Sequence, residues 1–163
     1  MILMTKEFEK AYSAAIRLLG FRARSRSQMI DKLSEKGHDE KIIQAVMVIL
    51  EDAGYINDIA YAKSFIESKR DRKFFGRRMI TQQLSQKGVS KTDIDDAYSQ
   101  LVDGDDERDA EQEAAIRALT KWLRTRDFDY QKAYAFLARR GYSTNVIKQA
   151  IASITEIKEE HHD

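Results

Sequence analysis

The chain has 163 residues, with 28 basic and 27 acidic residues, so its formal net charge is only +1. This balance gives no bulk electrostatic argument for nucleic-acid binding. The absence of cysteine excludes disulfides, thiolate metal sites and thiol catalysis, and the absence of proline permits long uninterrupted helices. No stretch approaches the roughly 18 apolar residues of a membrane span, and the first residues do not resemble a signal peptide. We therefore expect a cytoplasmic protein with no membrane partner.

An amphipathic pattern predicts the first helix near the start of the chain. Its apolar face has helical spacing and consists of Phe8, Tyr12, Ala15, Ile16 and Leu19. Two further helices are predicted over residues 25–36 and 39–53. Gly37 separates them, because glycine readily adopts the positive φ with which many helices end. Asp39 then caps the next helix by accepting a backbone N–H.

The same glycine-centred pattern recurs twice more. Gly37, Gly88 and Gly141 are 51 and 53 residues apart, and each follows a basic residue. Each also has a leucine four positions earlier, a capping residue two positions later, and apolar residues six, nine, ten and thirteen positions later. Twelve positions before each glycine stands another capping or turn residue: Ser25, Gly76 or Asp129. A fixed period of this size indicates tandem structural units.

The second and third units repeat the order of elements seen in the first. The apolar face of the first helix is Ile59, Ala62, Phe65 and Ile66 in the second unit and Ala114, Ala115, Ala118, Leu119 and Trp122 in the third. Further helices are predicted over residues 76–87 and 90–102, and over residues 129–140 and 143–157. We therefore predict an all-α fold of three tandem three-helix repeats, about nine helices, that form an elongated, curved array.

The repeats are predicted at residues 5–53, 54–103 and 104–157, with a polar tail at 158–163. Residues 54–58 join the first two repeats through a glycine, an apolar anchor and a helix cap. The acidic residues 103–107 join the last two repeats and are predicted to form a flexible hinge, although their charges also suit the N-terminus of the following helix. We expect a monomer, since no heptad seam indicates a dimer.

Charge alternates in blocks along the second half of the chain. Residues 63–87 contain eight basic and two acidic residues, residues 91–113 contain two basic and ten acidic residues, and residues 117–140 contain seven basic and two acidic residues. Such blocks are either ordinary solvated helix faces or parts of a surface that fits one partner.

Most aromatic residues fit the apolar faces of the predicted helices, namely Tyr12, Phe21, Tyr61, Phe65, Trp122, Tyr134 and Phe136. Phe74 and Phe75 differ, because they interrupt the basic run at residues 69–78. Aromatic residues among arginine and lysine can stack on nucleic acid or anchor a protein interface. The structural alternative is that Phe75 packs on the following helix and Phe74 packs between units.

The sequence contains no convincing catalytic constellation. Its glycines are isolated, so there is no glycine-rich phosphate loop. His38 lies in a predicted turn and His161 and His162 lie in the tail, without a metal-binding partner at helical spacing. Acid pairs such as Asp95 and Asp96 are adjacent, whereas carboxylate catalysis needs two groups that converge on one atom. We expect no enzymatic activity, no metal and no cofactor.

An ordered set of motifs resembles the RecX family. The segment Gly54–Ile66 is similar to the central signature of the family. That signature begins with glycine, an aromatic or aliphatic residue, isoleucine or leucine, aspartate or asparagine, and aspartate. It continues with tyrosine or phenylalanine before alanine, and with an aromatic residue before isoleucine. Phe75–Ile80 and Leu84–Gly88 match its Gly-x-x-x-Ile and Leu-x-x-Lys-Gly patterns. Ser25–Leu33 resembles its Ser-x-x-Glu-Leu-x-x-Lys-Leu pattern, and Phe136–Tyr142 is a looser match in the third unit.

The resemblance covers nearly the whole chain, from Phe8 to Thr155. It departs from the family pattern at Gln28 and Met29, where glutamate and leucine are usual, and at Asn57, where aspartate is usual.

The resemblance implies a regulator rather than an enzyme. Members of the family bind the RecA recombinase filament on DNA and depress its ATP hydrolysis, strand exchange and extension, in homologous recombination, DNA repair and the SOS response. Our hypothesis is that basic faces of the chain meet the acidic filament surface or the DNA backbone. The candidate partner-binding residues are Arg70, Arg72, Lys73, Arg77, Arg78, Arg124, Arg126, Arg139 and Arg140.

Two other functions stay open. One is direct DNA binding, because the turn at residues 36–39 resembles helix-turn-helix geometry. The other is a scaffold for an unrelated protein partner.

Overall fold

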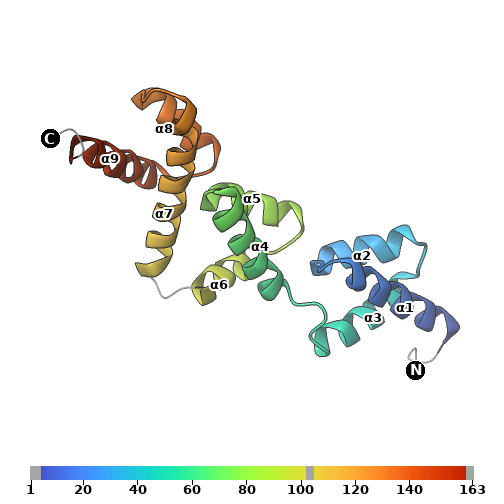
Figure 1. Cartoon of the computed structure of the whole chain (residues 1–163). Coiled ribbons are helices and arrows are strands. Elements are labelled where there is room, and N and C mark those ends of the chain that lie inside the picture. The colour runs from blue at the N-terminus through green and yellow to red at the C-terminus, as the bar shows by residue number, and fades with distance from the viewer. Residues whose placement is uncertain (1–4, 102–104, 161–163) are drawn as a thin grey trace.

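The computed structural model describes residues 5–101 and 105–160, and every secondary-structure element within these residues is a helix. The first unit contains α1 (Lys6–Phe21), α2 (Arg26–Glu35) and α3 (Glu40–Asp52), and the second contains α4 (Asp58–Lys73), α5 (Arg77–Gln86) and α6 (Lys91–Leu101). The third contains α7 (Asp105–Trp122), the short 3-10 helix η1 (Leu123–Thr125), α8 (Tyr130–Arg139) and α9 (Thr144–Glu160). Figure 1 shows the units in a row, with the two termini at opposite ends. The predicted all-α tandem-repeat fold is confirmed.

The second helix of each unit ends at the glycine that the sequence pattern identified. Gly37, Gly88 and Gly141 have φ angles of 86°, 80° and 93°, in the region that glycine enters without steric cost. The residue after each glycine donates its amide to the leucine carbonyl four positions before the glycine, at 3.2, 3.1 and 3.3 Å. This bond closes a Schellman motif, which satisfies a carbonyl that the end of the helix leaves without a partner.

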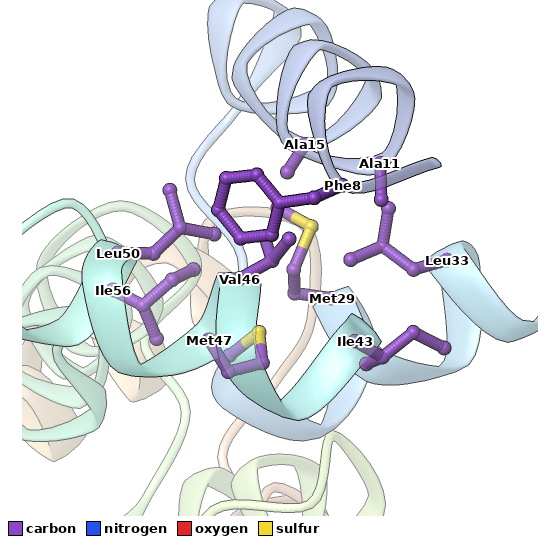
Figure 2. Close-up of a cluster of buried hydrophobic side chains, with 10 residues drawn as sticks. All are labelled: Phe8, Ala11, Ala15, Met29, Leu33, Ile43, Val46, Met47, Leu50 and Ile56. Atoms are coloured by element: carbon purple, nitrogen blue, oxygen red, sulfur yellow. The ribbon is translucent and has the colours of Figure 1, made fainter. Parts of the chain in front are cut away.

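Each unit has a hydrophobic core of its own. Figure 2 shows the core of the first unit, in which Phe8 from α1, Met29 from α2 and Leu50 from α3 point toward one another. The second and third units have separate clusters built on the same positions. Phe74, at the end of α4, is an exception, because it packs on the core of the third unit. The predicted packing of Phe74 between units is therefore confirmed.

The departures from the family pattern keep their structural roles. Ser25 and Gln28 form a reciprocal capping box, with both hydrogen bonds at 3.2 Å. Met29 is fully buried in the first core. Asn57 caps α4 by accepting the amide of Ala60 at 2.9 Å.

The structure adjusts two predicted boundaries and corrects the placement of one residue. Residues 105–107 belong to the first turn of α7, which was the alternative role predicted for their charges. Helix α9 continues to Glu160 and so overlaps the predicted polar tail at residues 158–163. Phe21 is 79% exposed at the end of α1 and does not belong to the core. The rest of the predicted hinge, His161 and His162 lie outside the described residues.

The three units are linked by one kind of contact that occurs twice, which we call a joint. In each joint, the N-terminus of the second helix of one unit lies on the C-terminal turn of the second helix of the next. In the first joint, Ser25 Oγ donates to the Lys87 carbonyl at 2.6 Å, and the Arg26 amide donates to Asp58 Oδ1 at 2.7 Å. The Arg26 amide, which has no partner inside the helix, thus gains an acceptor from the next unit.

The second joint uses the equivalent positions. The Gly76 amide donates to the Arg140 carbonyl at 2.8 Å, and the Arg77 amide donates to Glu111 Oε1 at 3.0 Å. The two backbones lie so close that a Cβ on Gly76 would be 2.5 Å from the carbonyl carbon of Gly141. Gly76 therefore has a steric role here, since its own φ of −79° is open to any residue.

Candidate functional site

The end of α4 places two basic residues next to the third unit. Helix α4 ends where Phe74 takes a left-handed conformation, with φ 55° and ψ 45°. The Phe74 carbonyl accepts hydrogen bonds from Arg140 Nε at 3.1 Å and from the Tyr142 hydroxyl at 2.8 Å. The guanidinium of Arg140 also donates to the Lys73 carbonyl. Because the last turn of α4 is held by these bonds, Arg72 and Lys73 lie at a fixed place beside α7.

A groove of about 380 Å³ lies at this junction. Five of its lining residues are cationic and none is acidic. We call it the basic groove, and its lining residues are Arg72, Lys73, Phe74, Ala118, Lys121, Trp122, Arg126, Phe136 and Arg140. The combination of one-sided charge and an apolar floor suits an anionic partner, which can also bury apolar surface.

Aromatic rings position two of the cations. The rings of Trp122 and Phe136 stack with their centroids 5.1 Å apart. The Arg126 guanidinium lies 5.2 Å from the Trp122 centroid, and the Arg140 guanidinium lies 5.4 Å from that of Phe136 and 5.0 Å from that of Phe75. Such cation–π contacts hold the guanidinium groups while leaving their charge without a counterion.

None of the five cations of the basic groove forms an ion pair with an acidic residue in the described part of the chain. Arg70 differs, since it pairs with Asp71 at 2.8 Å, and this hydrogen bond raises the pKa of Arg70. Arg77 also differs, since it lies 3.7 Å from Asp95 and packs over the Tyr98 ring at 4.1 Å. The pKa of Asp95 is lowered, first by its hydrogen bond from Lys91 and also by Arg77.

The structure brings together four of the nine predicted partner-binding residues. Arg72, Lys73, Arg126 and Arg140 line the basic groove. Arg78, Arg124 and Arg139 are exposed elsewhere, whereas Arg70 and Arg77 make the internal contacts described above. Their role in binding a partner stays a prediction.

Lys121 is the one cation of the basic groove that the prediction did not select. It lies in the basic block at residues 117–140. It lies one helical turn after Ala118 and directly before Trp122 in sequence, and both of these residues line the groove. The signal was its position next to the single tryptophan of the chain, on a helix whose acidic residues cluster at the other end.

Other chemistry finds little support in the described residues. No group of three or more histidine, cysteine or carboxylate residues there could hold a metal ion. None of the described helices is long and apolar enough to cross a bilayer. The turn at residues 36–39, which resembled helix-turn-helix geometry, has the same closing hydrogen bond as the turns after α5 and α8. It is therefore a property of the repeat and does not single out the first unit for DNA binding.

Comparison with known families accounts for all three units. The model described as the first three-helix domain of RecX matches residues 11–48, the second matches residues 57–97 and the third matches residues 109–151. Together these matches cover well over half of the chain. The chain belongs to the RecX family.

Individual relatives agree with this assignment. A protein named Regulatory protein RecX from Chlorobium phaeobacteroides is 32% identical over 149 residues, which are 90% of this chain and 94% of the relative. A protein of the same name from Streptomyces lividans is 34% identical over 88% of this chain and 78% of its own length. The names of these relatives support a regulatory role.

Solved structures show the same fold. The crystal structure of RecX from Lactobacillus salivarius superposes with a TM-score of 0.82 over 93% of this chain and 99% of that chain, at 24% identity. A second structure, described as regulatory protein RecX, gives a TM-score of 0.76 at 26% identity over 90% of this chain and 73% of its own.

Proposed function

We propose that this chain is a non-catalytic cytoplasmic regulator that binds the RecA recombinase filament on DNA and inhibits its ATP hydrolysis, strand exchange and extension. The basic groove is the observation that carries the proposal. Within residues 5–101 and 105–160 none of its five cations forms an ion pair, and two of them are held over aromatic rings. A desolvated acidic segment of a partner would supply the missing charge, and apolar side chains of that segment would cover the ring edges.

The elongated array supports a filament as the partner. Figure 1 shows the three units in a row, so each unit would face a different protomer of a regular polymer. Contacts on several protomers act at a high effective concentration, so weak individual contacts can combine into strong binding. No catalytic residue is needed, because a protein that holds protomers together or blocks the growing end already changes hydrolysis and extension.

Contact with DNA through the basic groove favours phosphates over bases. The Trp122 ring already stacks on Phe136 and contacts the Arg126 guanidinium. A base that stacks on Trp122 would have to displace one of them. A phosphate group needs only charged N–H donors, and the ammonium groups of Lys73 and Lys121 can supply them without displacing a ring.

The test is DNA-dependent ATP hydrolysis by the cognate recombinase, with the chain titrated in. Half-maximal inhibition should need well below one regulator per recombinase. The double charge reversal Lys73→Glu and Lys121→Glu should raise the half-inhibitory concentration on the order of tenfold or more. The control is Lys41→Glu with Lys148→Glu, which changes net charge equally at exposed positions away from the groove and should leave inhibition unchanged.

Two results would decide against the proposal. Equal loss of inhibition by both double variants would mean that net charge acts, not the groove. Absence of inhibition, combined with tight binding to bare single-stranded DNA that weakens steeply with salt, would indicate a DNA-binding module. Fluorescence of Trp122, the only tryptophan in the chain, reports on groove occupancy in the same titration.

A further inference from the structure

The first unit contains the same acceptor groups that the second and third units use in the joints. Thirty positions before each repeat glycine stands a carboxylate: Glu7, Asp58 or Glu111. Asp58 and Glu111 accept helix N-terminal amides from the preceding unit. Glu7 is exposed, and the structure describes no helix start of another unit beside it. The turns at the repeat glycines show the same difference between the first unit and the other two. A Cβ on Gly88 or Gly141 would collide with the preceding unit, whereas one on Gly37 would meet nothing within 4 Å.

The exposed face of α1 supports the equivalence of the first unit with the other two. A shallow hollow of about 510 Å³, which we call the cavity on α1, is open to solvent and lined by Lys6, Glu9, Lys10, Ser13, Ala14 and Arg17 of this one helix. The residues 104 positions further along are Ala110, Glu113, Ala114, Arg117, Ala118 and Lys121 on α7. All six of these line the two grooves that α7 forms with residues 70–74 of the second unit. The cavity on α1 is thus the counterpart of a surface that the preceding unit covers in the third repeat.

We propose that this open face, which consists of Glu7, the turn at Lys36 and Gly37, and the cavity on α1, binds the first turn of a helix from another protein. The Lys36 carbonyl and the Glu7 carboxylate are acceptors, so they suit the free amides of a helix N-terminus. The same pair of acceptors receives such an N-terminus at both joints of this chain. The inference does not depend on the recombinase as partner.

The joints also define the sequence of the occupant. The N-cap must be small, because Ser25 is fully buried in the first joint and Gly76 leaves no room for a Cβ in the second. The residue after it is arginine in both joints, at Arg26 and Arg77. The segment before the cap should be acidic, because Lys6 and Lys10 in the open face replace two alanines of α7.

A second copy of this chain does not fit the open face. The equivalent cap of α8 is Asp129, which accepts the Lys132 amide. Its carboxylate would face the acceptors Glu7 and the Lys36 carbonyl and could donate to neither. The residues before it include Arg124 and Arg126, which would meet the cations of the α1 cavity. The start of α8 therefore does not suit the open face, and the occupant must come from another protein.

The probe is a copy of the full chain with a matching helix start. The changes Arg124→Asp, Asp129→Ser and Tyr130→Arg give α8 an acid, a small cap and an arginine at the positions used in the joints. All three residues are exposed, and serine keeps the helix cap. A second probe carries Asp129→Gly instead of Asp129→Ser. Each unlabelled probe is titrated into ¹⁵N-labelled wild-type chain, and amide shifts are followed.

We expect amide shifts at Glu7, Lys10 and Gly37, with a dissociation constant below about 1 mM. This limit is the effective concentration that a short linker provides between two units of one chain, at which the joints of this chain form. Wild-type unlabelled chain should bind at least about tenfold more weakly, and Glu7→Lys in the labelled chain should abolish the shifts. Absence of shifts with both probes would overturn the proposal. Equal shifts with the wild-type chain would also overturn it, since Asp129 would then not exclude a second copy.

Discussion

Alanine at Gly76 should open the second joint while the helices on either side stay folded. The added Cβ would lie 2.5 Å from three backbone atoms of Gly141 and Tyr142, whereas non-bonded carbon atoms prefer separations of about 3.5–4.0 Å. Neither backbone segment can rotate away, so the second helix of one unit must move back from the turn of the next. The hydrogen bonds from Gly76 N to Arg140 O and from Arg78 N to Gly141 O, at 2.8 and 3.1 Å, would lengthen together.

The expected loss of stability follows from these contacts. Two backbone hydrogen bonds contribute about 0.5–1.5 kcal/mol each, and forcing a methyl group into a packed site costs about 1–3 kcal/mol. Since opening the joint relieves the clash at the expense of the bonds, the two costs do not add fully. We expect Gly76→Ala to lower the free energy of unfolding by about 3 kcal/mol.

A matched control isolates backbone strain from collision. Gly37 has φ 86°, but a Cβ there would meet nothing within 4 Å. Gly37→Ala should therefore cost only the price of a left-handed alanine, about 1–2 kcal/mol. Urea denaturation followed by circular dichroism and by Trp122 fluorescence measures both variants. If Gly76→Ala is no less stable than Gly37→Ala, the close approach at the second joint does not hold the units together.

Two further predictions concern the joints. Burial raises the pKa of the Asp58 carboxyl above its ordinary 3.8 and outweighs the opposite effect of the hydrogen bond from the Arg26 amide. The folded state therefore binds the Asp58 proton more tightly than the unfolded state does, and the stability of the protein falls as the pH rises through the raised pKa. Asp58→Asn, which keeps an acceptor oxygen, should thus gain stability relative to wild type as the pH is raised above about 4. A difference in the free energy of unfolding that stays constant with pH in urea denaturation would refute this. Arg140→Met removes a charged donor from the Phe74 carbonyl and should cost about 2–3 kcal/mol, against about 1 kcal/mol for Tyr142→Phe; equal losses would contradict the unequal roles of the two donors.

The turns and helices could be predicted because their causes are local. Gly37, Gly88 and Gly141 end helices through their own backbone freedom, and the leucine four positions earlier supplies the closing carbonyl of the same turn. Phe21 was misplaced because helical periodicity continues past the last covered turn. The structure of residues 105–107 was ambiguous from the sequence, since acidic residues favour both a helix N-terminus and an exposed loop.

The candidate site was harder to predict because it depends on contacts between units. Sequence blocks identified the basic residues but could not separate paired cations from unpaired ones. Arg77 is occupied by Asp95 and Tyr98 of α6, and Arg140 reaches the Phe74 carbonyl, 66 positions earlier. Neither partner shares a local pattern with its arginine. The residues that form the joints do occupy equivalent positions in the repeats. Which of them bond to one another became evident only from the arrangement of neighbouring units in the structure.

The two joints differ in strength, and the difference bears on function. Beyond the pair of contacts that both joints share, the second has Arg140 and Tyr142 donating to the Phe74 carbonyl, and the Phe74 side chain in the core of the third unit. The basic groove lies at this second joint, so its cations are positioned before a partner arrives and lose less freedom on binding. The first joint has no residue equivalent to Phe74 that enters the next core, and the first unit bears the open face. We therefore expect the second and third units to act as one rigid binding body, and the first unit to change its angle more readily.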